Sequence, residues 1–482
     1  MKRSLKLLSL VVAMFLIAAF VLSSSPAWGQ AQNGSISGVV TDSSGAVVGS
    51  AKVAVTSLTT GSIRTTQTTA EGDYTVQQLP PEDYKVVVTA PGFATSSSTL
   101  NVSVGSANTV NVKLTVGNAT VTVEVAANSV SGINLENAEN SQVIASNQMT
   151  EFPTESRNPY DFVSLSGNVS TDPSNGPNGA SRGVGVNISG SRSASTEILL
   201  DGIENTYLFS VGVGTPVPVD AVQEYRVITS NYGPEYGRAS GGVVNVVTKS
   251  GTNQFHGTMW EFYRPSTFAA QSTYNKANGI PLNRFVRNEF GFVVGGPVIK
   301  DKLFFFGGNE WLRVRSSNVT QFYVPAASFI SKSSAATQAF FTQYGTLSAT
   351  PVGNPLTLGQ VGGGPGALTS SFATDRTKLE TNFPTQFNDS TPIFQLVQET
   401  AFSDAGGGSP QNTYNTIGRI DFNMSQTTQM YGRYVLYNQV TPVGTQNVSP
   451  YAGYNTADTT KAQDLVYGPR TLSRRLSPHS CR

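Results

Sequence analysis

The sequence contains very little cysteine and histidine. Its 482 residues include one cysteine, Cys481, and two histidines, His256 and His479. A single thiol cannot close a disulfide within the chain or build a thiolate metal site, and two imidazoles are too few for His-rich zinc or iron centres. The composition therefore excludes disulfide-stabilised scaffolds and thiolate metal sites, and it argues strongly against His-rich zinc or iron centres.

Charge is also scarce, and neither sign prevails. Charged residues make up 13% of the chain, whereas soluble domains contain roughly 25%. The 31 Lys and Arg nearly balance the 30 Asp and Glu, so no global field would attract nucleic acid or anionic lipid. Glycine is abundant, with 47 residues, and Ser, Thr, Asn, Val and aromatic residues recur as in strands and tight turns. The composition predicts a mainly β protein.

The one long apolar run stands at the N-terminus. A basic start precedes the apolar residues 7–22, and small residues follow. This pattern predicts a secretory signal peptide over residues 1–29, cleaved near Gly29 or Ala31. A membrane-anchoring helix is the alternative, but the run is shorter than the ~20 residues that span a bilayer. No later apolar run is as long, so any other membrane segment would consist of β-strands.

Residues 30–116 alternate apolar and polar side chains between turn signals such as "DSSG" and "APGF". About seven short strands in this length predict a small β-sandwich. The segments "GVVTDSSGAVVGSAKVAV", "EGDYTV" and "LPPEDYKVVVTAPGF" resemble the carboxypeptidase regulatory-like domain, which implies a transthyretin-like sandwich. Some relatives of that fold bind carbohydrate. The aromatic residues Tyr74, Tyr84 and Phe93 are predicted to pack in the core or at strand edges.

Aromatic-rich runs appear from about Phe255 onward, including "FHGTMWEFYR" and "NTIGRIDFNMSQTTQMYGRYVLYN". In the second run Ile420 and Phe422 alternate with Arg419 and Asp421. The alternation predicts transmembrane β-barrel strands, with one face toward lipid and the other toward an aqueous lumen. A soluble barrel or sandwich is the alternative. The polar, glycine-rich residues near 326–408 predict a long external loop.

Three short motifs lack what their chemistry requires. "GGVVNVVTKS" has Thr248 where a phosphate-binding loop needs glycine. "GASRG" around Ser181 follows a polar loop and not the strand that a nucleophile elbow needs, and only His256 or His479 could serve as its base. "DGIEN" brings Asp201 and Glu204 together without the spaced oxygen ligands of a calcium loop, so we predict a turn with exposed acids. We therefore predict neither enzyme activity nor a cofactor.

Two segments carry a specific resemblance. "GVNISGSRSASTEILLDGIENT" and "VPVDAVQEYRVITSNYGPEYGRASGGVVNVVTKSGTNQFHGTMWEFYR" resemble the plug domain of a TonB-dependent outer-membrane receptor and its exit into the barrel. The order of sandwich, plug and barrel is similar to the Oar-like branch of that family. The resemblance implies an α+β plug at residues 131–251 and barrel strands at residues 252–482, in a family whose barrels have about 22 strands.

The resemblance also implies functional residues. The plug motif consists of Asp201, Gly202, Arg238, Gly241 and Gly242. Its glycines would allow close backbone approach, and Arg238 is predicted to pair with carboxylates of the barrel lumen. A candidate TonB box lies in the linker at residues 117–130, where a partner could add a strand. The same residues could instead be the last strand of the sandwich; they are Val121, Thr122, Val123, Glu124 and Val125.

The resemblance implies export to the outer membrane and uptake of a large ligand, an oligosaccharide or a peptide, driven by the TonB protein. Outer-membrane lipid is then a partner and nucleic acid is not. A surface or adhesion protein and a carbohydrate-binding module are alternatives without transport. After Gly251 there remain 231 residues (482 − 251), enough for six to eight strands, and the end "YGPRTLSRRLSPHSCR" lacks strand alternation. We therefore expect a C-terminally truncated fragment of a longer receptor.

Overall fold

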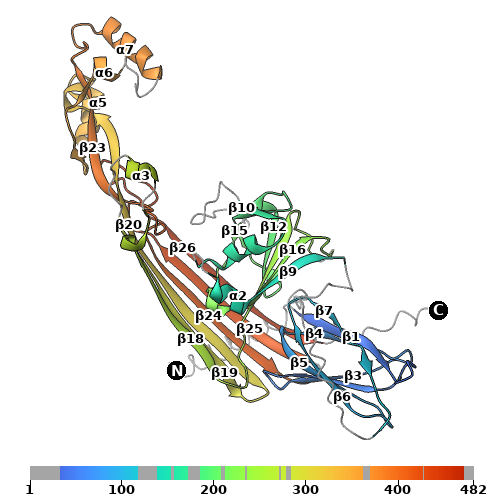
Figure 1. The fold of residues 1–482 in the computed structure, drawn as a ribbon. Helices are drawn as coiled ribbons and strands as arrows, with labels where there is room; N and C mark the ends of the chain where they lie inside the picture. The colour runs from blue at the N-terminus through green and yellow to red at the C-terminus, as the bar shows by residue number, and fades with distance from the viewer. Residues whose placement is uncertain are drawn as a thin grey trace, which may run out of the picture.

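The computed structural model describes ten segments of the chain. They are residues 33–117, 138–152, 157–171, 185–207, 212–233, 236–270, 273–277, 284–361, 370–426 and 428–471. These segments form a sandwich, a central unit that corresponds to the predicted plug, a curved sheet of long strands, and a lobe at one end of that sheet (Figure 1).

The sandwich consists of two sheets that bury alternate side chains. One sheet has the order β4-β1-β7, with β8 also pairing with β1, and the other has the order β3-β2-β5-β6. Tyr74 and Tyr84 are buried, and their hydroxyls donate to the carbonyls of Val110 and Pro80. The strands are β1 (Gly34–Thr41), β2 (Lys52–Ser57), β3 (Ile63–Gln67), β4 (Asp73–Leu79), β5 (Glu82–Thr89), β6 (Ser96–Val102), β7 (Ala107–Thr109) and β8 (Val112–Lys113).

The plug is built on a five-stranded sheet with the order β13-β12-β17-β16-β9. Strands β12 and β17 run parallel and are buried along their whole length, as expected of strands covered on both faces. The elements are β9 (Asn140–Ala145), α2 (Ser146–Glu151), η2 (Pro159–Leu165), β10 (Val169–Thr171), β11 (Val186–Ile188), η3 (Ser193–Ser195), β12 (Thr196–Leu200), β13 (Ile203–Glu204), β14 (Thr206–Tyr207), β15 (Gly212–Val213), η4 (Val219–Ala221), β16 (Val222–Ser230) and β17 (Gly242–Thr248).

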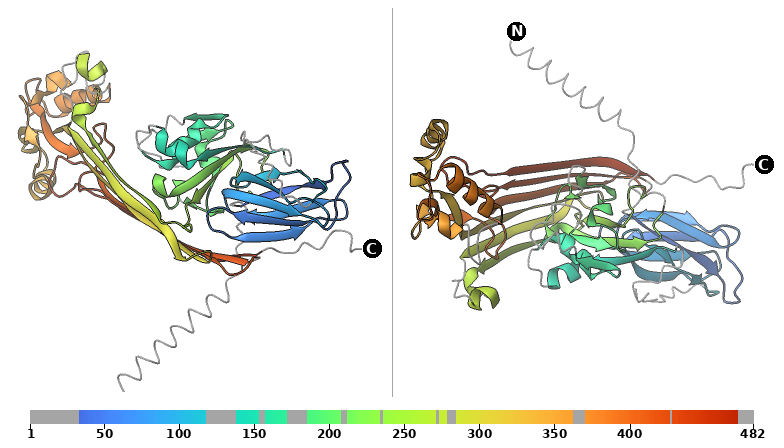
Figure 2. Two further views of the ribbon diagram at one scale, coloured as in Figure 1. Left: turned by 60° about the horizontal axis from the view of Figure 1, so that its bottom comes forward. Right: turned by 90° about the horizontal axis from the view of Figure 1, so that it is seen from above.

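Six long antiparallel strands curve around one side of the plug (Figure 2). They are β18 (His256–Pro265), β19 (Phe285–Ile299), β20 (Leu303–Pro325), β24 (Gln411–Asn423), β25 (Thr428–Val440) and β26 (Thr459–Thr471), in that order. Outer residues such as Ile420 are exposed and inner ones such as Ile417 pack into the plug core. Among the described residues β18 and β26 do not pair, so the prediction of a partial barrel is confirmed.

The segment predicted as a long loop joins β20 to β24 and contains its own elements. The end of β20 pairs with β23 (Pro392–Phe402), and Leu358, Phe387 and Ile393 form a small core. The other elements are α4 (Ala327–Ile330), α5 (Ala335–Tyr344), β21 (Thr350–Pro351), β22 (Leu356–Thr357), α6 (Leu358–Val361) and α7 (Ser370–Asn382), while η5 (Ser266–Phe268) and α3 (Thr273–Ala277) follow β18. The expected loop is thus a folded lobe in its described part.

None of the helices in the described segments has the length and apolar character needed to cross a bilayer.

Candidate functional site at the interface of plug and barrel

Asp201, in the turn after β12, is completely buried. Its backbone has a φ of +52°, a left-handed conformation that aspartate tolerates better than most residues. The amide of Thr248 donates to Oδ1 at 2.9 Å, and the Thr248 hydroxyl donates to Oδ2 at 2.9 Å. The prediction of an exposed acid is therefore wrong for Asp201, because this turn faces the barrel sheet and not solvent.

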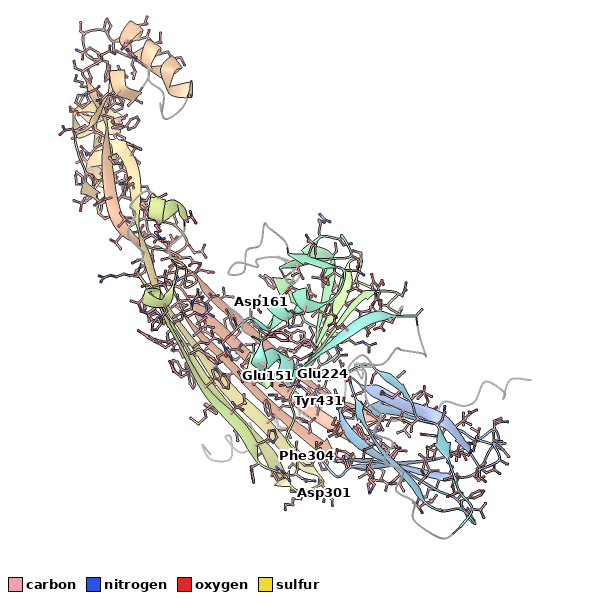
Figure 3. The ribbon with its side chains drawn as sticks, in the orientation of Figure 1. Glu151, Asp161, Glu224, Asp301, Phe304 and Tyr431 are labelled. Atoms are coloured by element: carbon pink, nitrogen blue, oxygen red, sulfur yellow. The ribbon has the colours of Figure 1, made fainter. Side chains whose placement is uncertain are left out.

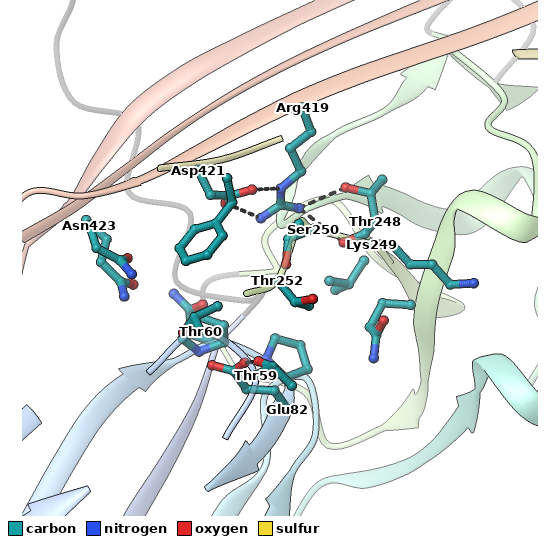
Figure 4. Close-up of a pocket in the computed structure, with 18 of the residues that line it drawn as sticks. Thr59, Thr60, Glu82, Thr248, Lys249, Ser250, Thr252, Arg419, Asp421 and Asn423 are labelled. Carbon is teal, nitrogen blue, oxygen red and sulfur yellow. Dashed lines mark hydrogen bonds and ion pairs between the residues drawn. The ribbon is translucent and has the colours of Figure 1, made fainter. Parts of the chain in front are cut away.

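Two arginines of the barrel sheet contact the carboxylate of Asp201. Arg419 of β24 donates from Nη1 to Oδ1 at 3.3 Å, and Arg433 of β25 donates from Nη1 to Oδ2. The two arginines are direct cross-strand partners, which explains why they converge. Arg419 also forms a bidentate pair with Asp421, with both distances 2.9 Å (Figure 4), and Arg433 also binds Asp464 of β26.

This cluster holds its charges away from water. Arg433 is 1% exposed and Arg419 is 5% exposed. Burial by itself would raise the pKa of Asp201, but the guanidinium groups of Arg433 and Arg419 outweigh it and lower that pKa below its usual value. Asp201 is therefore an anion at neutral pH. Moving Asp201 away from the cluster would leave two buried cations without the anion that they share. The free-energy cost of this separation is large unless water hydrates the arginines.

A second ionic cluster joins plug and barrel near β18 and β19. Arg157, which precedes η2, contacts Asp220 of the plug at 2.5 Å and Glu289 of β19 at 2.9 Å. Its guanidinium lies 4.0 Å from the ring centroid of Phe262, and Arg287 donates to the same Glu289 at 2.8 Å. Between the two domains, a plug cation, Arg157, contacts a barrel anion, Glu289, which reverses the charges of the contact between Asp201 and the barrel arginines.

The sequence contains a signal for these arginines that lies outside any short motif. Arg419 and Arg433 lie inside strands that were predicted to cross a membrane. An ionisable side chain in such a strand must face the interior and find a partner, so it is a functional candidate by position alone. Arg157 has no comparable signal, because it lies in a polar segment.

The plug motif residues are separated into two groups by the structure. The Gly202 amide donates to Asn245 at 3.2 Å, close to Asp201. A Cβ on Gly242 would lie 2.7 Å from Ile188 Cγ2, and one on Gly241 would lie 2.9 Å from Ser191 Cβ. At both positions neighbouring side chains therefore occupy the space that a larger residue would need.

Arg238 pairs with an acid of the plug. Its Nη1 lies 3.2 Å from Glu204 Oε2, and its side chain is 58% exposed. Pairing with a carboxylate of the barrel lumen stays a prediction. The β13 turn that carries Glu204 lies beside Arg238, and an exposed pair of this kind contributes little to stability.

The chain leaves the plug through residues 249–255 between β17 and β18. A Cβ on Gly251 would lie 2.3 Å from the carbonyl oxygen of Phe305 and 2.7 Å from that of Gly296. The backbone of this seam is thus pressed against β19 and β20. Burial lowers the pKa of Lys249, at the start of the seam, and nearby Asp220 offsets part of that effect.

A cavity of about 240 Å³ lies where sandwich, seam and barrel sheet meet (Figure 4). Most of its lining residues have polar side chains, and they come from three separate parts of the chain, which is why local sequence patterns gave no indication of the cavity. Burial raises the pKa of Glu82, which accepts a hydrogen bond from Thr59. The lining includes Thr59, Thr60, Glu82, Ser250, Thr252, Arg419, Asp421 and Asn423. Within the described segments no group of three or more metal-binding side chains occurs.

Known protein families match two parts of the chain. Residues 247–476 match the outer membrane beta barrel domain, and residues 35–115 match the carboxypeptidase regulatory-like domain. The TonB-dependent transporter Oar of Myxococcus xanthus is 30% identical over 308 residues, which are 61% of this chain and 28% of that protein. The chain is thus similar to the TonB-dependent outer-membrane receptors over part of its length. Its barrel domain makes it a protein of the outer membrane.

Two further proteins are similar to parts of the chain. A protein of Acinetobacter baumannii named "Probable TonB-dependent siderophore receptor PirA" is 33% identical over 153 residues, 29% of this chain and 18% of that protein. The chain spans less than a third of the length of both curated relatives. Among solved structures, the outer membrane transporter YddB of Escherichia coli is 12% identical with a TM-score of 0.42, over 69% of this chain and 37% of that chain.

Several predicted residues lie outside the described segments. They include the signal-peptide cleavage positions Gly29 and Ala31, the candidate TonB box at residues 121–125, and Ser181 of the "GASRG" motif. These assignments stay predictions.

Replacing Gly251 with alanine is expected to lower the free energy of unfolding by about 2 kcal/mol, because the added methyl group forces the seam away from two backbone carbonyls. Urea denaturation of the receptor in detergent measures this loss. Gly237→Ala is the matched control, since no atom lies within 4 Å of the position of its Cβ. Equal denaturation midpoints for the two variants would contradict close packing at the seam.

Proposed function

We propose that this receptor takes up a ligand too large for porins across the outer membrane, with a TonB protein as its energy source. The buried ionic cluster of Asp201, Arg419 and Arg433 is the observation that carries the proposal. The ionic part of the interface between plug and barrel can loosen when water hydrates its charges, whereas a purely apolar interface offers no such route. The names of the two curated relatives describe TonB-dependent transport and siderophore reception, and both support this class of function.

The ligand we propose is an oligosaccharide or a peptide. The lobe between β20 and β24 supports this choice, because it exposes the aromatic side chains of Phe340 and Tyr344 on the uncharged helix α5, and that of Phe383 just after α7. Aromatic rings of this kind present apolar contact area to a neutral ligand at low entropic cost. The lobe lies at the end of the sheet opposite the sandwich (Figure 1), and long connections of outer-membrane barrels are extracellular.

A surface or adhesion protein without transport is the second candidate, and the folded lobe favours it, since a projecting surface can bind without a path through the barrel. The sandwich is a weaker candidate for glycan binding. Tyr74 and Tyr84 are buried in its core, so they offer no platform to a sugar ring.

An uptake experiment distinguishes these functions. Cells that produce the receptor are given fluorescent maltooligosaccharides or fluorescent peptides, with and without a functional TonB gene. We expect accumulation of one ligand class that falls to the level of receptor-free cells when TonB is absent. Uptake that survives the loss of TonB, or surface binding with no accumulation in either strain, would overturn the transport proposal. The second result would favour the adhesion protein.

A further inference from the structure

The sandwich contacts the plug through the turn between β6 and β7. Val104, in this turn, is fully buried, and its backbone uses both of its polar groups on the plug strand β16. The Val104 amide donates to the carboxylate of Glu224, and the Val104 carbonyl accepts from Arg226 Nη1 at 2.8 Å. Glu224 lies at the side of the plug that faces the sandwich (Figure 3). The turn is therefore held by two side chains of a single plug strand.

Glycine is required next to this contact. Gly105 has a φ of +60°, and a Cβ built on it would lie 1.8 Å from Arg226 Nη1. The guanidinium cannot easily move aside, because Nη2 also contacts Glu139 at 2.6 Å and Ser141 at 3.2 Å. Burial raises the pKa of Glu224 to about 7, which shows how completely the docked turn removes this carboxyl group from water.

The same sandwich also contacts the barrel sheet and the seam. The carbonyl of Thr59 accepts from the amide of Asn253 at 3.0 Å, and the buried Arg64 donates from Nη2 to Gln429 of β25 at 3.0 Å. Gly61 lies against the turn between β19 and β20, where its Cβ would be 2.4 Å from Asp301 Oδ1. Figure 3 places Asp301 at this end of the sheet. Short turns of outer-membrane barrels face the periplasm, so the sandwich docks on the periplasmic side.

The docked domains keep separate hydrophobic cores. The sandwich core contains only residues of the sandwich, whereas the plug core includes Val293, Phe306, Ile417 and Val435 of the barrel sheet. The contacts of the sandwich with the plug, the seam and the barrel sheet are mostly polar, as in transient interfaces between domains. The sandwich can therefore leave without exposing either core, whereas the plug cannot leave the barrel sheet without exposing its own.

We propose that the sandwich is a detachable periplasmic clamp, which while docked fixes plug strand β16 to the barrel turns, so that the plug can rearrange only after the sandwich detaches. The proposal concerns the order of two movements in one chain. It does not depend on the ligand or on transport, and its test involves neither.

Hydrogen exchange of the purified 482-residue chain in detergent tests the clamp. Gly105→Ala places a methyl group on Arg226, and we expect amide exchange in β16 and β17 to accelerate by about tenfold, the factor that corresponds to about 1.4 kcal/mol of lost docking free energy. Gly92→Ala is the matched control. Gly92 also has a positive φ, +83°, but no atom lies within 4 Å of its Cβ position, so exchange in β16 and β17 should match the unmodified receptor.

A second pair of variants tests the contact from the plug side. Glu224→Gln keeps an oxygen that accepts from the Val104 amide, and we expect exchange in β17 to stay slow. Glu224→Ala removes the acceptor, and we expect β17 to exchange as fast as in Gly105→Ala. The clamp is overturned if both Gly105→Ala and Glu224→Ala accelerate exchange only at residues 103–106. It is equally overturned if the unmodified turn exchanges as fast as the exposed turn at Gly92.

Discussion

Replacing Asp201 with asparagine is expected to lower the free energy of unfolding by about 3 kcal/mol, the lower end of the range for breaking a buried ion pair. The substitution removes the anion that Arg419 and Arg433 share, and it places a neutral side chain between two buried guanidinium groups. Asparagine has the same shape and tolerates the φ of +52°. The lost charge is therefore the main change. Urea denaturation in detergent, followed by tryptophan fluorescence, measures the effect.

Asp301→Asn provides the control for this substitution. Asp301 also has a left-handed backbone, with a φ of +65°, but it lies in an exposed turn, where it accepts a hydrogen bond from Asn253 at 2.7 Å. Surface substitutions usually change stability by about 0.5 kcal/mol or less. If both variants lost the same stability, the cost would come from the turn conformation and not from the buried charge.

The buried state of Asp201 illustrates what a sequence pattern omits. The residues "DGI" predict a turn, and a turn is present, with Asp201 and Gly202 both at positive φ. The two arginines that bury Asp201 lie 218 and 232 residues further along the chain. No local pattern encodes a pairing at that separation. The turn could therefore be predicted from the sequence, but the arginines that bury it could not.

The barrel strands were more predictable, because their pattern repeats every two residues. Ile420 was predicted to lie on the face opposite Arg419, and Ile420 is exposed whereas Arg419 is buried. The alternation does not give the register between strands, which places Arg419 beside Arg433. Register depends on the whole length of paired strands. The sequence therefore predicted which side chains share a face of the sheet, but it did not predict the ionic cluster.

Arg238 and Arg157 show a limit of motif transfer. The family resemblance drew attention to Arg238, which the structure pairs with a neighbouring plug acid. The arginine that does reach a barrel carboxylate is Arg157, whose partners Asp220 and Glu289 lie 63 and 132 residues away. Both arginines lie in polar segments of the plug and look alike as sequence, so only the three-dimensional path of the chain separates their roles.

Arg157→Met is expected to lower the free energy of unfolding by about 3 kcal/mol. It removes the cation between Asp220 and Glu289, both of which are buried. Methionine fills part of the space over Phe262, so the loss reports mainly on charge. Arg157→Lys should lower the stability less, because lysine keeps the charge but cannot contact both carboxylates as the guanidinium does.

Arg376→Met is the control for Arg157→Met. The partners of Arg376, Glu380 and Asp389, are solvent-accessible, so the loss of stability should be within about 1 kcal/mol.

The double variant Asp201→Asn/Arg157→Met tests whether the plug is released as one unit. The two ionic clusters share no residue. Independent sites give losses that add to within about 0.5 kcal/mol. A plug held separately at each cluster would show that sum in urea denaturation. A double loss clearly smaller than the sum would mean that breaking either cluster already frees the whole plug from the barrel sheet, in which case each cluster stabilises the interface only while the other is intact.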